Sequence, residues 1–255
     1  MSEILTETTE DAFLGGQLRL RQPRSGHRSG HDAMLLAAAT AARPDDRVVE
    51  FGAGVGAAGL ALAKRIGGVA LTLIEIDPQL ALLARDNAAA NNIAADVVVL
   101  DVTSGAEAFA ALGLAADSAD VVLMNPPFND AARHRASPDQ ARASAHVADT
   151  ETLERWVHAG RRLLKSGGAL TLIWRADGLS EVLAALGRGF GSLVMLPVHS
   201  DAAKPAIRVL VRAVKGGRAP TRILASLLLK DESGVPNKQV AEMLAGGEVL
   251  PLANP

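Results

Sequence analysis

The chain has 255 residues, with 28 Asp and Glu, 26 Lys and Arg, and a formal net charge of −2. Apolar residues make up 49% of the chain, which is more than disordered proteins carry, so we expect a folded protein. The chain contains no cysteine, which excludes a disulfide scaffold and any cysteine-ligated zinc or iron–sulfur site.

The first residues are acidic and do not show the basic-then-apolar order of a signal peptide. No apolar run reaches the roughly 18 residues that a membrane-spanning helix needs. We therefore expect a soluble cytoplasmic protein with no membrane partner.

Residues 1–28 hold few apolar positions, so we expect a loose start with short strands around Gln17–Arg21. A helix is predicted over His31–Ala42, with Asp32 in its first turn, where a carboxylate suits the positive end of the helix dipole. Strands and helices alternate after this helix. The predicted strands are Arg47–Phe51, Ala70–Ile76, Ala95–Leu100, Ala119–Met124, Ala169–Trp174, Ser192–Pro197 and Ile207–Val214. The predicted helices are Ala57–Ile66, Pro78–Asn91, Thr150–Leu164 and Leu179–Leu186.

This alternation predicts a mostly parallel sheet with helices on both faces. The last two strands are joined by a short connection, so we expect an antiparallel pair at the edge of the sheet. The long irregular stretch Asn129–Asp149 is of a length that is usually functional in α/β domains. From about residue 216 onward, the tail is predicted to be an extension of the same domain.

A glycine-rich segment, Gly52–Gly56, follows the strand Arg47–Phe51 and opens the next helix. Glycines at such a turn let a ligand approach the backbone, and the helix N-terminus supplies free N–H groups. The pattern G-x-G-x-x-G over Gly54–Gly59, with Glu75 at the end of the next strand, is typical of dinucleotide sites. A site for S-adenosylmethionine (SAM) uses an acid ahead of the loop, here Glu50, to hold the methionine ammonium.

Three acids favour SAM. Glu50, Glu75 and Asp101 end or follow three successive strands, so they line the crevice at the carboxyl edge of an open sheet, where Glu75 suits ribose hydroxyls. A pyrophosphate is disfavoured near Glu50, whereas a cationic sulfonium amino acid is favoured there. We predict SAM as the ligand, with a dinucleotide and a ligand-free structural glycine turn as the alternatives.

The strand Ala119–Met124 runs directly into Asn125-Pro126-Pro127-Phe128. The two prolines fix the backbone and have no N–H, so the carbonyls and the Asn125 side-chain oxygen remain available as acceptors. Rigid acceptors beside a stackable ring suit methyl transfer to a planar amine, because they stabilise the positive charge that develops on nitrogen. We therefore predict catalytic roles for Asn125, Pro126, Pro127 and Phe128. A proline turn that merely ends the strand is the alternative.

Glu50–Gly56 together with Asn125–Phe128 resembles the class I SAM-dependent N-methyltransferases that carry an N-P-P-[FY] motif. Residues 24–36, 138–143 and 208–210 narrow the resemblance to the bacterial tRNA(Val) adenine-N6 methyltransferase family, over about residues 17 to 245. Two positions depart from that family, since Phe128 replaces the commoner Tyr and His31 stands where Thr is frequent.

The resemblance implies an α/β, Rossmann-like class I methyltransferase fold with a seven-stranded, mostly parallel sheet and an antiparallel edge strand. It implies SAM as the methyl donor and residues 31–255 as the catalytic domain, with residues 1–30 partly covering the cofactor. The predicted cofactor-binding residues are Arg28, His31, Glu50, Gly52, Ala53, Gly54, Glu75, Ile76, Asp101, Val102 and Asn125.

Basic residues gather in three segments, 19–31, 133–142 and 204–222, which predict a tRNA-binding surface if they share one face. The six histidines show no metal-ligand spacing, and we predict no metal. Adenine N6 in tRNA is the expected acceptor. The alternatives are the side-chain amide of a protein glutamine, a small molecule, and a SAM-binding protein without catalysis.

Overall fold

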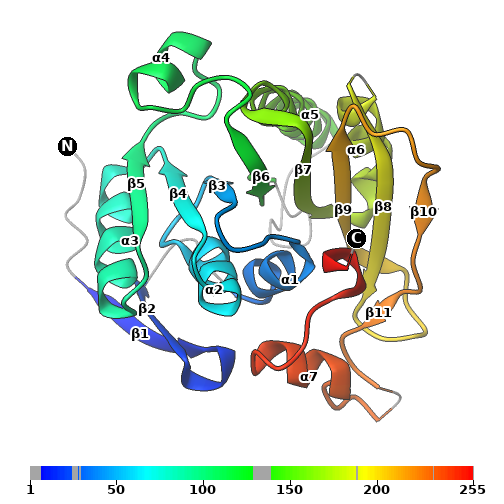
Figure 1. Ribbon diagram of the computed structural model, residues 1–255. Coiled ribbons are helices and arrows are strands. Elements are labelled where there is room, and N and C mark those ends of the chain that lie inside the picture. Colours follow the sequence, from blue (N-terminus) through cyan, green and yellow to red (C-terminus); the bar gives the residue numbers. More distant parts are fainter. Residues whose placement is uncertain are drawn as a thin grey trace.

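The structure is a computed structural model that describes residues 7–24, 28, 30–128, 139–187, 189–231 and 233–254, with the backbone alone for residues 139–148. One mixed sheet carries the fold, in the order β5-β4-β3-β6-β7-β9-β8-β10, and β11 also pairs with β8 (Figure 1). The strands are β3 (Arg47–Phe51), β4 (Ala70–Glu75), β5 (Ala95–Val99), β6 (Ala119–Met124), β7 (Leu164–Arg175), β8 (Phe190–His199), β9 (Ala206–Lys215), β10 (Arg222–Ile223) and β11 (Leu227–Leu228). Strands β3 to β7 are parallel, which confirms the predicted fold class.

Two expectations about this sheet are wrong. The sheet has nine strands rather than seven, because the tail returns along β8 and adds the two-residue strands β10 and β11. The antiparallel strand is also not at the edge, since β9 lies between β7 and β8 and is antiparallel to both. A short connection makes two successive strands antiparallel, but it does not decide which of them pairs with the rest of the sheet.

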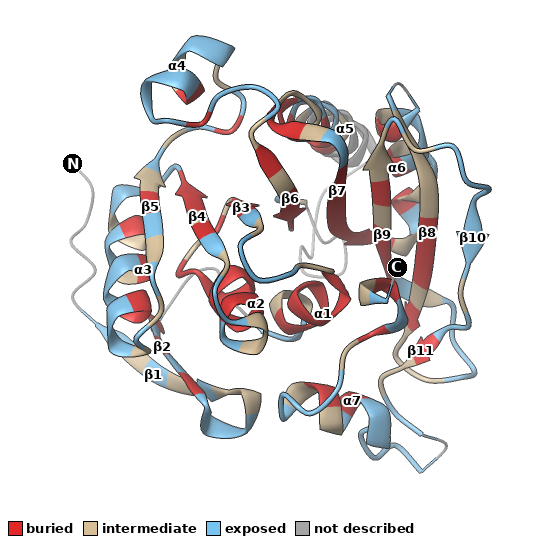
Figure 2. Ribbon diagram, viewed as in Figure 1, coloured by how far each residue is buried: buried red, intermediate tan, exposed pale blue. Residues whose placement is uncertain are grey.

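Helices cover both faces of the sheet and create two cores (Figures 1 and 2). The helices are α1 (His31–Ala39), α2 (Ala57–Ile66), α3 (Pro78–Ala90), α4 (Ala106–Ala111), α5 (Asp139–Leu163), α6 (Leu179–Leu186) and α7 (Lys238–Leu244). Side chains of α1, α2 and α3 belong to one core, and those of α4, α5 and α6 belong to the other. Strand β6 serves both, because Val121 and Leu123 point into the first core while Val122 and Met124 point into the second.

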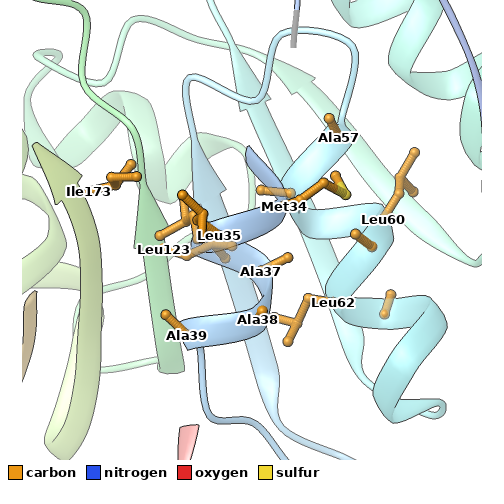
Figure 3. Packing of buried hydrophobic residues seen from close by; sticks show 14 of the residues in the cluster. Met34, Leu35, Ala37, Ala38, Ala39, Ala57, Leu60, Leu62, Leu123 and Ile173 are labelled. Atoms are coloured by element: carbon orange, nitrogen blue, oxygen red, sulfur yellow. The ribbon is translucent and has the colours of Figure 1, made fainter. Parts of the chain in front are cut away.

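Helix α1 is buried along most of its length, with Met34 to Ala39 all in the core. Figure 3 shows Leu35 beside Leu123 of β6 and Ala38 beside Leu62 of α2. The C-terminal segment covers its far end, where Leu250 N donates to the Ala38 carbonyl at 3.0 Å. Since every side of α1 is packed, the position of its first turn relative to the sheet is well determined.

The strand expected around Gln17–Arg21 is confirmed as β2 (Leu18–Pro23), but the expected loose start is wrong for residues 8–13, which form β1 (Thr8–Phe13) and pair with β2 in a hairpin. Alternate residues of β2 are buried, and this two-residue period marks it as a strand with one face in a core. Helix α5 also begins at Asp139 rather than at Thr150, so the second part of the expected 129–149 loop is helical. The remaining part, 129–138, lies outside the described residues.

Asn87 of α3 joins the hairpin to the glycine-rich loop. Its side chain accepts a hydrogen bond from Arg21 N at 2.8 Å and donates to the Arg21 carbonyl at 3.1 Å and to the Val55 carbonyl at 3.0 Å. Asn91, one turn later, repeats this pattern with the backbone of Arg19 at a more exposed position. Asn87 is 1% exposed, so water cannot replace these three bonds.

We expect Asn87→Ala to lower the free energy of unfolding by more than Asn91→Ala does. Each buried backbone group left without a partner costs about 1–3 kcal/mol, whereas water can satisfy the groups around Asn91. Urea unfolding of the two variants, which remove the same atoms from one helix, measures the difference. Equal losses would contradict the inference that the burial of Asn87 makes its bonds the more important ones.

Candidate functional site

The four neighbouring strands β5, β4, β3 and β6 carry polar side chains at their carboxyl ends. Glu50 is the next-to-last residue of β3, Glu75 ends β4, Asp101 follows β5 and Asn125 follows β6. Because the strands are parallel and adjacent in the sheet, these four residues lie along one edge. Open α/β sheets bind their ligands in the crevice outside this edge.

Glu50 is the most strongly perturbed acid of this edge. Its side chain is buried, and its Oε2 accepts a hydrogen bond from Gly59 N at 2.7 Å. Burial raises the pKa of Glu50 from its ordinary 4.5 to about 8, the N–H of Gly59 opposes the rise, and the negative charge of Glu75 adds to it. Burial makes the charged form of Glu50 unfavourable, and an incoming cation would stabilise that charged form. The ammonium group of an amino acid is such a cation.

The pH dependence follows from the sign of this shift. Between pH 4.5 and about 8 the folded protein binds a proton at Glu50 that the unfolded chain has lost, so Glu50 makes the ligand-free fold less stable as pH rises through this window. A cationic ligand requires the carboxylate form, so SAM affinity is expected to rise from pH 6 to pH 8. Calorimetric titration across this range measures it.

Glu50→Gln is the matched variant, because it keeps the shape of the side chain and removes its charge. It is expected to bind SAM weakly and without the rise in affinity between pH 6 and pH 8. Wild-type affinity that stays flat over this range would contradict the assignment of Glu50 to the ammonium group.

The glycine-rich loop is tied to the strand next to it. Ala53 N donates to the Ile74 carbonyl at 2.9 Å, and Gly54 N donates to Glu75 Oε2 at 2.7 Å. Gly54 has a φ of +56°, and a Cβ added there would meet open space. Gly52 has a φ of +63°, and a Cβ added there would collide with the Trp156 ring. The loop is therefore closed on the Trp156 side and open at Gly54.

At the ends of β4 and β5, acidic and apolar residues are neighbours in the sequence. Glu75 is buried, and its other oxygen accepts a hydrogen bond from Asp77 N at 2.9 Å. Ile76, which follows it, is 61% exposed although it is apolar. Asp101 is exposed and accepts hydrogen bonds from the N–H and the hydroxyl of Thr103, whereas Val102 is buried.

The segment Asn125–Phe128 follows β6 at the same edge. The Asn125 Oδ1 atom is buried, and no donor from the described residues reaches it. Pro126 is buried, Pro127 is exposed and Phe128 is half-buried. The Phe128 ring meets the Trp174 ring at 5.2 Å and 69°, an edge contact. A buried acceptor without a donor is uncommon in folded proteins and points to a ligand that supplies the donor.

Two further predicted cofactor residues, Arg28 and His31, precede and begin α1. Arg28 pairs with Asp11 and donates to the Pro23 carbonyl, so its described contacts go to the β1–β2 hairpin. His31 is the exposed first residue of α1. Their roles at the cofactor remain predictions.

Two side chains that support the site escaped the sequence analysis. Trp156 packs against the glycine-rich loop from α5, and Asn87 holds the Val55 carbonyl from α3. The available signal for Asn87 was a buried polar residue on the apolar face of a predicted helix. Trp156 carried only the signal of a core residue, because which loop a core side chain touches depends on helix packing.

The described parts of the basic segments are spread over the fold. The hairpin that carries Arg19 and Arg24 contacts α3, whereas β9 and β10 lie at the opposite end of the sheet (Figure 1). Several of the bases form ion pairs, with Arg19 bound to Glu10 and Arg24 bound to Glu7. The side chains of segment 133–142 lie outside the described residues.

The described part of the chain contains no helix that is both long and apolar enough to cross a membrane. Within the same residues, no three His, Asp or Glu side chains are grouped as metal ligands.

Comparison with known proteins decides the family. Residues 28–197 match the profile of the methyltransferase small domain. The chain belongs to the methyltransferase small domain family. It is 30% identical to a tRNA1(Val) (adenine(37)-N6)-methyltransferase of Porphyromonas gingivalis over 68% of each chain. It is also 27% identical to the protein of the same name from Dickeya chrysanthemi, over 86% of this chain and 87% of that one.

A solved structure, a predicted O-methyltransferase of Agrobacterium tumefaciens, superimposes with a TM-score of 0.71 at 32% identity, covering 86% of this chain and 98% of that one. This methyltransferase small domain protein is thus an enzyme that uses SAM as its methyl donor. The residues at this edge of the sheet fit that cofactor, because they present a buried carboxylate suited to a cation and a glycine whose missing side chain leaves space.

Proposed function

We propose that this methyltransferase transfers the methyl group of SAM to an exocyclic amine, adenine N6 in tRNA. The observation that carries the proposal is the buried Oδ1 atom of Asn125, an acceptor that no donor among the described residues reaches, at the end of the strand next to β3. The names of the relatives from Porphyromonas gingivalis and Dickeya chrysanthemi supply the acceptor class. Action on tRNA would place the enzyme in the cytoplasm.

Within this proposal, the acids of the crevice hold different parts of the cofactor. Glu50 would bind the ammonium group and Glu75 the ribose hydroxyls, while Asp101 would accept from the adenine amine. Ile76 offers the exposed apolar surface on which the adenine ring can lie. Ala53 and Gly54 would border the cofactor from the glycine-rich loop, and Asn87 would keep that loop in place. The hairpin anchored by Asn87 would then partly cover the site.

SAM supplies an electrophilic methyl group on a sulfonium. Asn125 Oδ1 would accept one N–H of the target amine, and backbone carbonyls of the motif would accept the other. Both bonds strengthen as positive charge develops on nitrogen, which lowers the barrier. Phe128 would stack on the target ring and hold the amine in line with the methyl group. The target base must leave its stack to reach this position.

The acceptor is tested by incubating the purified enzyme with tritiated SAM and separate tRNA and protein fractions from a strain that lacks it. Label in tRNA that digests to N6-methyladenosine supports the proposal. Label only in protein would favour a glutamine acceptor instead. Label on a nucleoside oxygen would agree with the name of the Agrobacterium tumefaciens relative and contradict an amine acceptor. Binding of SAM without label in either fraction would point to a small-molecule acceptor or to loss of catalysis.

A further inference from the structure

The first turn of α1 is connected to the Asn125–Phe128 motif through one arginine of β9. Arg208 Nε donates to Asp32 Oδ2 at 3.0 Å, and its guanidinium carbon lies 5.0 Å from the centre of the Phe128 ring. Asp32, Arg208 and Phe128 are far apart in sequence and meet only in the folded protein. Both distances are short enough for a direct ion pair and for a cation–π contact.

Phe128 is held from two directions. Arg208 lies over its ring, and the fully buried Trp174 meets it edge-on at 5.2 Å. These contacts restrict the two side-chain torsions of Phe128 before any substrate binds. A target ring that stacks on Phe128 must therefore use the part of the ring that Arg208 and Trp174 leave free.

Arg208 is itself held in one orientation. Its side chain is 20% exposed and that of Asp32 is 31% exposed, so the ion pair is only partly in water. A second donor of Arg208 binds the Ile207 carbonyl at 3.0 Å. Arg175, its partner across the β7–β9 ladder, pairs with Glu181 and Asp177 instead. Since each arginine has its own carboxylate, Arg175 does not compete for Asp32.

We propose that Arg208 is a positioning residue for methyl transfer: oriented by Asp32, it fixes the Phe128 ring as the surface on which the target ring stacks. The inference rests on the proposed function of the Asn125–Phe128 motif. It assigns to Asp32 a role beyond its favourable place at a helix N-terminus. It also gives Arg208 a role other than phosphate binding, which the 204–222 segment had suggested.

The test uses the single variants Arg208→Met, Arg208→Lys and Asp32→Asn and the double variant that combines Asp32→Asn with Arg208→Met. Steady-state kinetics on tRNA are measured for each at saturating SAM. Loss of positioning by about an ångström can cost up to about 100-fold, so Arg208→Met is expected to lower kcat by about 10- to 100-fold. SAM affinity and the KM for tRNA should change little. Arg208→Lys keeps a cation for the ring and should restore part of kcat. Asp32→Asn with Arg208→Met should be no slower than Arg208→Met alone, because both act on one contact.

Glu242→Gln is the matched control for Asp32→Asn. It removes the carboxylate of another ion pair, the one that Glu242 forms with Lys238 on α7, away from the Asn125–Phe128 motif. An unchanged kcat in Arg208→Met would overturn the inference. A parallel fall of kcat, SAM affinity and melting temperature in all variants, without rescue by lysine, would also overturn it, because that is the result of a merely structural ion pair.

A readout without activity separates this inference from the proposed function. The chain has five phenylalanines, so fluorine NMR of the fluorophenylalanine-labelled protein is tractable, and Phe128→Leu assigns the resonance. Arg208→Met should shift and broaden the Phe128 resonance, and Glu242→Gln should not. If wild-type enzyme methylates no amine while this shift appears, the proposed function fails and the contact stands. If the resonance is unaffected, the positioning role is refuted whatever the acceptor.

Discussion

Asn125→Ala is expected to abolish most methyl transfer while SAM binding is largely retained. The substitution removes the buried Oδ1 acceptor, which has no donor among the described residues and would accept from the target amine. Removing one preorganised group that faces developing charge typically costs about 10²- to 10³-fold in kcat. Single-turnover methylation of tRNA with saturating SAM measures the chemical step directly.

The control is Asn254→Ala, which changes an exposed asparagine in the C-terminal segment. It should methylate at the wild-type rate. If Asn125→Ala also methylated at that rate, the assignment of Asn125 would be wrong. If it lost SAM binding together with activity, Asn125 would act at the cofactor rather than at the amine.

Gly52→Ala is expected to destabilise the protein and to weaken SAM binding. At a φ of +63°, an alanine costs about 1–2 kcal/mol in the backbone. Its Cβ would also collide with the Trp156 ring, and such overpacking costs about 1–3 kcal/mol. Together these costs are a large fraction of the free energy of unfolding of a typical domain, which is about 5–15 kcal/mol. Thermal unfolding and SAM titration measure the two effects.

Gly54→Ala is the matched control within the same loop. Its φ of +56° imposes the same backbone cost, but its Cβ meets open space rather than Trp156. We therefore expect a smaller loss of stability, together with a clear loss of SAM affinity because the added methyl group would occupy space proposed for the cofactor. Wild-type SAM affinity in Gly54→Ala would place the cofactor elsewhere.

Much of the sheet could be predicted from local patterns. The strands from Arg47 to Met124 are short apolar runs separated by helices, so their type and their parallel direction follow from the chain order. The same order places Glu50, Glu75, Asp101 and Asn125 at one edge, because each ends or follows a parallel strand. The place of β9 between β7 and β8 did not follow, since strand order beyond a short connection depends on which faces must be buried.

The hairpin of residues 8–23 shows why weak patterns mislead. Its apolar positions are few, and it is stabilised by bonds from Asn87 and Asn91 that exist only when α3 lies beneath it. The start of α5 at Asp139 was missed for a similar reason. Its first residues are largely polar, and the expected start at Thr150 followed the apolar periodicity.

The fold class, the glycine-rich loop, the acids at the strand ends and the Asn125–Phe128 motif could be predicted from the amino-acid order, because each depends on residue types at a fixed distance from a strand end. The raised pKa of Glu50, the Asn125 oxygen that no described donor reaches, and the contacts of Arg208 with Asp32 and Phe128 follow from the three-dimensional packing alone. Burial and side-chain contact are set by segments distant in the chain. Local sequence patterns do not contain these contacts. They form only when α1, β9 and the Asn125–Phe128 motif pack against one another.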